Sequence, residues 1–174
     1  MVNVPPSDEL ELALSEASGV RPVVAGATLI HPGRAAAEHA WPATRWAVVA
    51  EEEAAAGRQV VVLAEEADDE VAWQVAGLAG LGRRSMVPTP TDLVDLLALV
   101  AGADRVLTDD PQMARAAWAT GTPSLVLACE DEAPTPPAGP HVLVTGAHLA
   151  AIEVDEVLDA LPRLPRRRGR GPGR

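Results

Sequence analysis

Carboxylates are concentrated in one short stretch of the sequence. Residues 65–70 read EEADDE, which places five acids in six positions. Acids this dense could hold a divalent cation through oxygen ligands, but the alternating DxDxDG spacing of a calcium loop is absent. We therefore interpret these residues as solvated, helix-capping acids, and we expect neither a metal site nor another cofactor.

The other residue types that perform catalysis show no catalytic spacing. His31, His39, His141 and His148 never form the HxxxH or HExxH pattern of a zinc site. A GxSxG nucleophile elbow and a Walker loop are also missing. Cys129 is followed by the acids Glu130 and Asp131, which disfavour a reactive thiolate. No residue is therefore assigned a catalytic role.

Short β-branched runs alternate with segments of helical periodicity, a pattern typical of βαβ units and a parallel sheet. We expect a doubly wound, Rossmann-like α/β fold of five or six strands with helices on both faces. The expected strands are residues 28–31, 59–63, 85–87, 105–108, 124–127 and 141–144. The expected helices are residues 42–56, 68–78, a helix capped by Thr91 and Asp92, 111–120 and 154–161. Their buried stripes are expected to contain Val71, Val75, Leu78, Leu93, Leu96, Leu97 and Val100.

Ligands of open α/β sheets bind beyond the carboxyl ends of the strands, which here selects the loops after His31, Leu63 and Thr108. The acidic loop is a poor phosphate site, because it has neither glycine nor a basic residue. At about 5 Å and an effective dielectric constant of about 20, each carboxylate repels a phosphate charge by on the order of 3 kcal/mol. A helix N-terminus returns only about 0.3–2 kcal/mol. Phosphate binding would therefore need Arg34, Arg115 or a metal in compensation.

The four tryptophans lie on the expected helices or at their entries. We interpret Trp46, Trp73 and Trp118 as packing residues. Trp41 follows the first loop, where it could stack on a nucleotide base.

The chain is acidic, with a formal net charge of −11 over 174 residues. This charge disfavours nucleic acid as a partner. Six of the 14 arginines fall in residues 163–174, where glycine and proline predict a disordered tail. The sequence has no apolar run long enough for a transmembrane segment and no secretory signal. We therefore expect a cytoplasmic protein.

Two blocks of the sequence carry a set of motifs in a particular order. Residues 28–63 hold an HPG turn, a Trp-Pro pair that opens a helix, and a second strand. Residues 89–128 hold a helix, a strand, an acid-led loop, an Ala-rich helix and Gly-Thr-Pro. Together with a closing helix at residues 152–161, these blocks resemble glycosyltransferase family nine, the heptosyltransferase family of lipopolysaccharide and cell-envelope assembly, over most of residues 20–162. The resemblance implies the C-terminal lobe of a two-lobed GT-B enzyme, the lobe that binds the nucleotide sugar.

The resemblance also implies roles for particular residues, with departures from the family pattern. His39 stands at the family's phosphate-contacting lysine, and Asp68 stands at its ribose-binding acid. Asp110 matches the acid of an Asp-Ser/Thr-Gly-x-x-His motif, whereas Arg115 replaces its histidine. The departures predict weak or lost binding of a nucleoside-diphosphate sugar, with Arg115 as a compensating cation. The expected substrate-binding residues are His31, Gly33, Arg34, His39, Trp41, Asp68, Asp110 and Arg115.

We divide the chain into an N-terminal extension or linker remnant (1–26), a Rossmann-like lobe (27–162) and the arginine-rich tail (163–174). Family members carry the acceptor site and the catalytic base on an N-terminal lobe, which residues 1–26 are too few to form. One hypothesis is a donor-binding lobe that is inactive alone and is completed by a separate acceptor lobe or by self-association. A second is a pseudoenzyme, a relic kept as a structural or protein-binding domain. A third is a stand-alone binder of a cationic or neutral small molecule.

Overall fold

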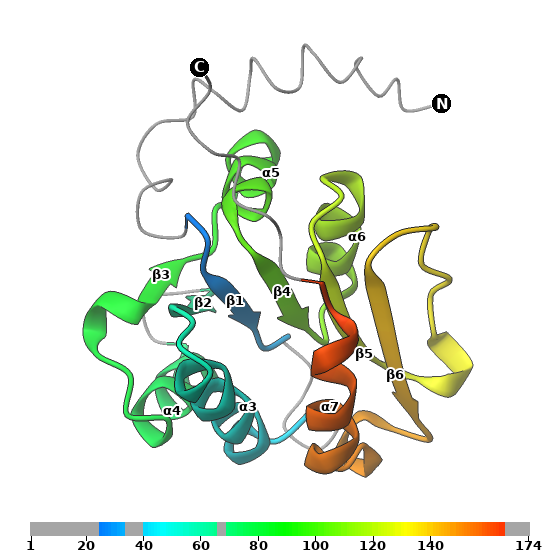
Figure 1. Cartoon of the computed structure of the whole chain (residues 1–174), viewed down its shortest axis with the longest axis horizontal. Coiled ribbons are helices and arrows are strands. Elements are labelled where there is room, and N and C mark those ends of the chain that lie inside the picture. The colour runs from blue at the N-terminus through cyan, green and yellow to red at the C-terminus, as the bar shows by residue number, and fades with distance from the viewer. Residues whose placement is uncertain (1–24, 34–39, 66–68, 166–174) are drawn as a thin grey trace.

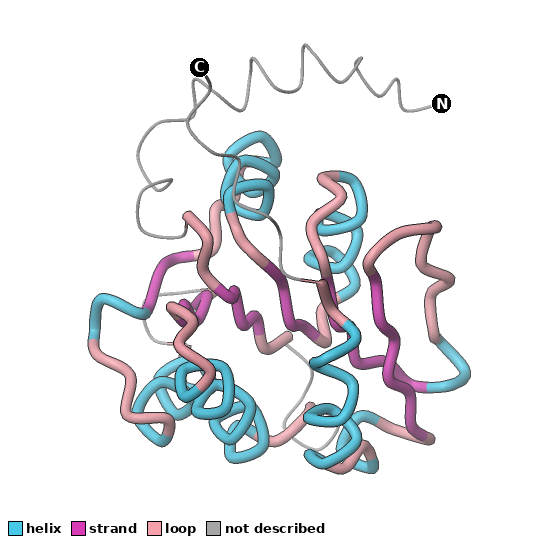
Figure 2. Tube along the Cα trace, viewed as in Figure 1, coloured by secondary structure: helices cyan, strands magenta, loops and turns pink. Residues whose placement is uncertain are grey.

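A computed structural model describes residues 25–33, 40–65 and 69–165 of the chain. Its centre is a six-stranded, wholly parallel sheet with the strand order β3-β2-β1-β4-β5-β6 (Figure 1). Helices cover both faces of the sheet, as the tube in Figure 2 shows. The expected Rossmann-like fold is confirmed.

The strands follow the β-branched runs of the sequence. β1, β2 and β4 are fully buried in the middle of the sheet, as expected of apolar strands covered on both faces. β5 and β6 pair as far as Cys129 and Gly146, two residues beyond the ends expected from sequence. The bounds are β1 Thr28–His31, β2 Val60–Ala64, β3 Met86–Pro88, β4 Arg105–Thr108, β5 Ser124–Cys129 and β6 His141–Gly146.

The helices begin and end at residues with capping chemistry. Asp69, Asp92 and Asp110 accept hydrogen bonds from amides in the first turns of α4, α5 and α6. Gly57 and Gly121 follow α3 and α6 with positive φ angles, which a glycine adopts without strain. The bounds are α3 Ala43–Ala55, α4 Glu70–Leu78, α5 Leu93–Gly102, α6 Pro111–Ala119 and α7 Val154–Ala160.

The sheet separates two apolar clusters. Ile30, Val62 and Leu125 point to the face covered by α3, α4 and α7. Leu29 and Val61, their neighbours along the strands, point to the face covered by α5 and α6. The chain thus changes face between β3 and β4, which makes the sheet doubly wound.

Two of the expected buried stripes are wrong in part. Leu93 is 65% exposed, because α5 packs through Ala98, Leu99 and Val100. α5 is apolar on nearly every side, so its periodicity does not select a face. Leu78 is also exposed, because α4 packs through Val75 and two small alanines.

None of the helices within the described residues combines the length and the apolar character needed to cross a bilayer.

Candidate functional site

The strand order changes direction between β1 and β4. β1 is followed by β2 on one side, whereas β4 lies beside β1 on the other side. The loops that leave these two strands therefore diverge, and open α/β sheets bind ligands at this switch point. His31, Gly33, Thr108, Asp109 and Asp110 all lie on these two loops or on the strand ends beside them.

His31 is held on both sides by neighbouring strands. Its Nε2 lies 2.7 Å from Oε1 of Glu65, and its side chain is buried. The hydroxyl of Thr108 donates to the carbonyl oxygen of His31 at 2.9 Å and accepts from the amide of Asp110 at 2.9 Å. The His31 imidazole is therefore engaged within the protein.

Asp109 joins the two diverging loops. The amide of Gly33 donates to Oδ1 of Asp109. Burial raises the pKa of Asp109 above its ordinary value, and the hydrogen bond from Gly33 offsets part of this effect. Asp110 was the acid expected from the sequence at this loop, whereas Asp109 had no expected role. The signal for Asp109 was its place directly after a buried strand at the switch point.

Asp110 and Arg115 lie on either side of the first turn of α6. The carboxylate of Asp110 accepts from the amide of Met113 at 2.7 Å, so it caps the helix. Arg115 is exposed and lines a cleft of about 190 Å³ at the carboxyl ends of β4 and β5. The cleft walls are Asp109, Pro111, Arg115, Val126, Leu127, Ala128, Cys129, Glu132, Pro134 and Leu149. Arg115 and Asp109 thus line the same cleft. Asp110 lies between them in the sequence and caps the helix.

Trp41 does not form the expected stacking surface. Its side chain is 1% exposed, and its Nε1 donates to the carbonyl oxygen of Ile152 at 2.9 Å. Its ring meets Trp46 edge-on, with the centroids 4.7 Å apart. Trp41 is a core residue, and this corrects the assignment made from its position after the first loop. Trp73, expected to pack, is instead 44% exposed.

Three expected site residues, Arg34, His39 and Asp68, lie outside the described residues. Three other acids of residues 65–70, namely Glu65, Asp69 and Glu70, are described. Asp69 accepts from the amides of Glu65 and Ala72, both at 3.0 Å, which confirms its capping role. Among the described residues, no group of three or more His, Cys, Asp or Glu side chains could hold a metal ion.

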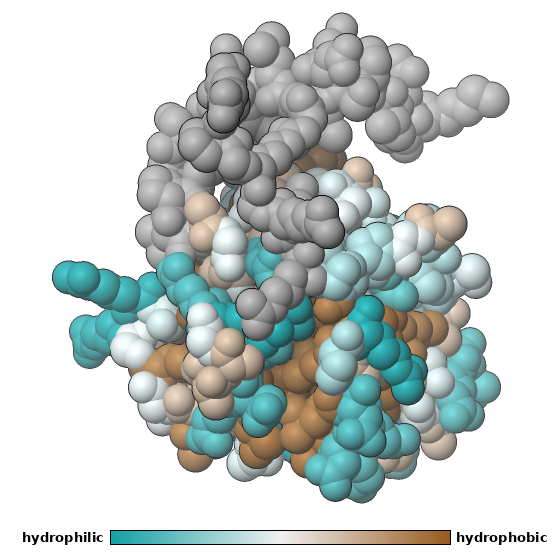
Figure 3. All heavy atoms as spheres, viewed as in Figure 1, coloured by the Kyte–Doolittle hydropathy of each residue, from teal (hydrophilic) through white to brown (hydrophobic). Residues whose placement is uncertain are grey.

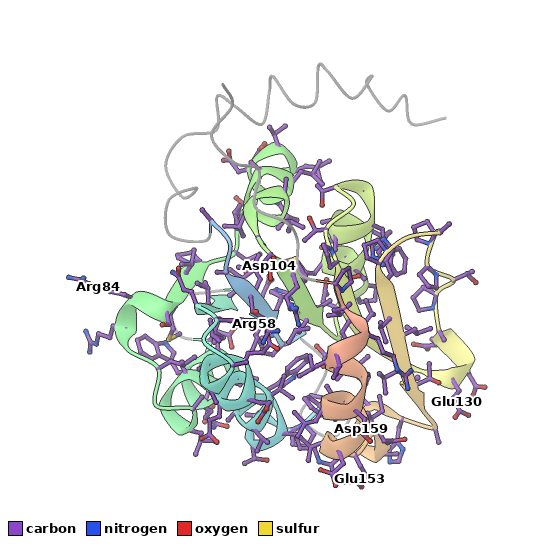
Figure 4. All side chains as sticks on the ribbon, in the orientation of Figure 1. Arg58, Arg84, Asp104, Glu130, Glu153 and Asp159 are labelled. Atoms are coloured by element: carbon purple, nitrogen blue, oxygen red, sulfur yellow. The ribbon has the colours of Figure 1, made fainter. Side chains whose placement is uncertain are left out.

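A second hollow, of about 360 Å³, lies at the opposite, amino-terminal edge of the sheet. Leucines of α7 and the segment after it line this hollow together with Arg58 and Arg105. Figure 3 shows apolar surface between α3 and α7 on this side of the molecule. In Figure 4, Arg58 and Asp104 lie near the middle of the same view, whereas Arg84 and Glu130 project at its rim. The carboxyl-edge cleft is the better candidate site, because it adjoins the switch point.

The comparisons with known proteins agree with this architecture. The family model of glycosyltransferase family 9 (heptosyltransferase) matches residues 4–159. No curated protein matches the chain. The chain belongs to glycosyltransferase family 9.

Solved structures of the same family share the fold. A family 9 glycosyl transferase from Veillonella parvula DSM 2008 superposes with a TM-score of 0.72 at 17% identity, over 93% of this chain and 53% of that chain. E. coli heptosyltransferase WaaC with ADP-2-deoxy-2-fluoro heptose gives 0.65 at 16% identity, over 88% and 47%. E. coli ADP-heptose lps heptosyltransferase II gives 0.64 at 21% identity, over 93% and 52%. The chain therefore spans about half the length of these structures.

Proposed function

We propose that this chain is the nucleotide-sugar-binding, C-terminal lobe of a family 9 glycosyltransferase that acts in the cytoplasm in cell-envelope glycan or lipopolysaccharide assembly. The observation that carries the proposal is the cleft beside the switch point, with Arg115 in its wall. A guanidinium is suited to a phosphoryl group, because its planar donors pair with two oxygens at once. One of the similar structures, WaaC, holds an ADP-sugar analogue.

In this proposal, the chain binds the donor and a separate lobe completes the transfer site. Transfer to an acceptor needs a general base within hydrogen-bond reach of the acceptor hydroxyl. Asp110 is committed to capping α6, and Glu65 is committed to His31. We propose that the base and the acceptor site come from another lobe, and that residues 27–162 alone do not transfer sugar.

Titration of the chain with ADP-, UDP- and GDP-sugars, followed by calorimetry, tests the proposal. We expect saturable binding by one nucleotide class, weakened about tenfold by Arg115→Ala, because a charge-assisted hydrogen bond contributes about 1.5–3 kcal/mol. Arg84→Ala, an exposed arginine away from the cleft, is the matched control and leaves the affinity unchanged. Equal losses in both variants would show that Arg115 acts only through net charge.

A second candidate is a non-catalytic domain that keeps the fold for packing or for binding another protein. It is favoured by the carboxylates of Asp109 and Glu65, which already engage Gly33 and His31 at the switch point. Absence of binding by the unmodified chain to every nucleotide sugar at millimolar concentration would select this candidate over the first.

A further inference from the structure

Asp109 and Gly33 lie on loops that leave two different strands, and they are in direct contact. The Gly33 amide points at Oδ1 of Asp109. A Cβ atom added to Gly33 would lie 2.9 Å from the same oxygen. Only a residue without a side chain lets the carboxylate approach the turn in this way, because real Cβ contacts are longer.

The carboxylate of Asp109 is enclosed as well as close. Its Oδ2 is buried and has no hydrogen-bond partner among the described residues. Burial raises its pKa, which records the cost of keeping a charge there, while the Gly33 amide and the nearby His31 favour the charged form. A buried carboxylate oxygen without a hydrogen-bond donor costs free energy. The pairing of Asp109 with Gly33 therefore limits which ligand groups can bind at this corner of the cleft.

A phosphoryl oxygen bound at the switch point would need the backbone amide of Gly33 as a hydrogen-bond donor. Backbone amides at a strand-to-helix turn are the groups that bind phosphate in α/β folds. Here the amide of Gly33 already donates to an anion that belongs to the protein. A second anion at this position would meet both an occupied donor and a like charge.

We propose that Asp109 is a specificity-determining residue: as a tethered anion on the Gly33 amide, it excludes a phosphoryl group from the β1–β4 corner of the cleft. This inference rests on the proposed function, since it defines which part of a nucleotide sugar the corner accepts. A neutral, hydroxyl-bearing group would meet no such repulsion beside Asp109. The diphosphate is directed toward Arg115, which lines the same cleft.

Binding of inorganic pyrophosphate and of ADP tests the inference on the full chain. Three proteins are compared at a single pH of about 8, well above the ordinary carboxyl range: the unmodified chain, Asp109→Asn and Asp109→Ala. Asp109→Asn removes the charge and keeps a carbonyl acceptor for Gly33, whereas Asp109→Ala also frees the amide. Asp131→Asn is the matched control, because it removes the same charge from an exposed site on the loop after β5. Circular dichroism and thermal melts confirm that each variant folds.

We expect pyrophosphate to bind about tenfold or more tightly to Asp109→Asn than to the unmodified chain, and at least as tightly to Asp109→Ala. Asp131→Asn leaves the affinity unchanged. The inference would be overturned if the Asp109 variants gained no more affinity for pyrophosphate than Asp131→Asn does, or if both of them bound pyrophosphate more weakly than the unmodified chain. If one Asp109 variant fails to fold, the other gives the same comparison.

The two proposals fail in different ways. Tight binding of ADP to the unmodified chain, with no gain in either Asp109 variant, keeps the donor-binding function and removes the role of Asp109. A gain for pyrophosphate in the Asp109 variants, with no binding of any nucleotide sugar, keeps the role of Asp109 and removes the donor-binding function.

Discussion

Glu53 of α3 and Arg105 of β4 form an ion pair inside the protein, with 3.5 Å between Arg105 Nη1 and Glu53 Oε1 and at most 2% of either side chain exposed. The same carboxylate accepts a hydrogen bond from Thr28 at 2.6 Å and lies 3.4 Å from Nη1 of Arg58. These groups gather at the amino-terminal edge of the sheet, opposite the cleft. The pair therefore ties a helix to two strands without taking part in the candidate site.

Removing the carboxylate of Glu53 should destabilise the fold strongly. Glu53→Gln removes the most deeply buried counter-charge of the Arg105 guanidinium and leaves Asp104, whose carboxylate lies 3.8 Å from Arg105 Nε. Removing one partner of a buried ion pair costs about 3–5 kcal/mol in other proteins. Urea denaturation followed by circular dichroism measures the loss of unfolding free energy. Glu51→Gln, on the exposed side of the same helix, is the control and should change the value by less than about 0.5 kcal/mol. Similar small effects in both variants would contradict the buried pair.

Gly33→Ala should destabilise the chain through its contact with Asp109. The new methyl would stand 2.9 Å from Oδ1, so the loop or the carboxylate must move, at about 1–3 kcal/mol. The loss should be smaller when Asp109 is already alanine, because the opposing atom is gone. A double-mutant cycle by urea denaturation measures this coupling. Strictly additive losses of unfolding free energy would show that the side chains at positions 33 and 109 do not interact.

Most of the fold could be predicted from the sequence, because each element carries its own local signal. The buried strand runs, the aspartate caps and the glycines after α3 and α6 are all local features. The direction in which an apolar helix faces is not local. α5 places Leu93 outward because the sheet contacts its C-terminal half, and nothing within that helix encodes this.

The candidate site was predicted in part, for a related reason. The loops could be identified, because they follow buried strands, and Asp110 and Arg115 were assigned from a sequence motif. The pairing of Asp109 with Gly33 joins positions 76 residues apart, and the link from His31 to Glu65 spans 34. Such contacts depend on strand order, which periodicity does not specify. Trp41 was misassigned because its partner, Ile152, is also remote in sequence.

Replacing Trp41 should affect stability far more than replacing Trp73. Trp41→Phe loses the hydrogen bond to Ile152 and part of the edge-on contact with Trp46, at about 1–3 kcal/mol. Trp73→Phe changes a side chain that is 44% exposed and should cost less than Trp41→Phe. Chemical denaturation of both variants gives the comparison. The reverse order of the two losses would contradict a core role for Trp41.

His141 should make the stability of the chain depend on pH. Burial lowers its pKa below the ordinary histidine value of about 6.5, and its Nδ1 lies 3.0 Å from the hydroxyl of Ser124. Between the lowered and the ordinary pKa, the unfolded chain binds more protons than the folded chain. The unfolding free energy therefore decreases as the pH falls through this window.

Denaturation curves at a series of pH values measure the slope of the unfolding free energy against pH. His141→Gln should reduce it, whereas His148→Gln, an exposed histidine, should leave it as it is. The ring of Trp118 lies 6.2 Å from that of His141, so protonation in the folded state should also change tryptophan emission. Trp118→Phe removes that optical signal and leaves the pH dependence of unfolding, which separates the reporter from the titrating group. An unchanged slope in His141→Gln would assign the pH dependence to another residue.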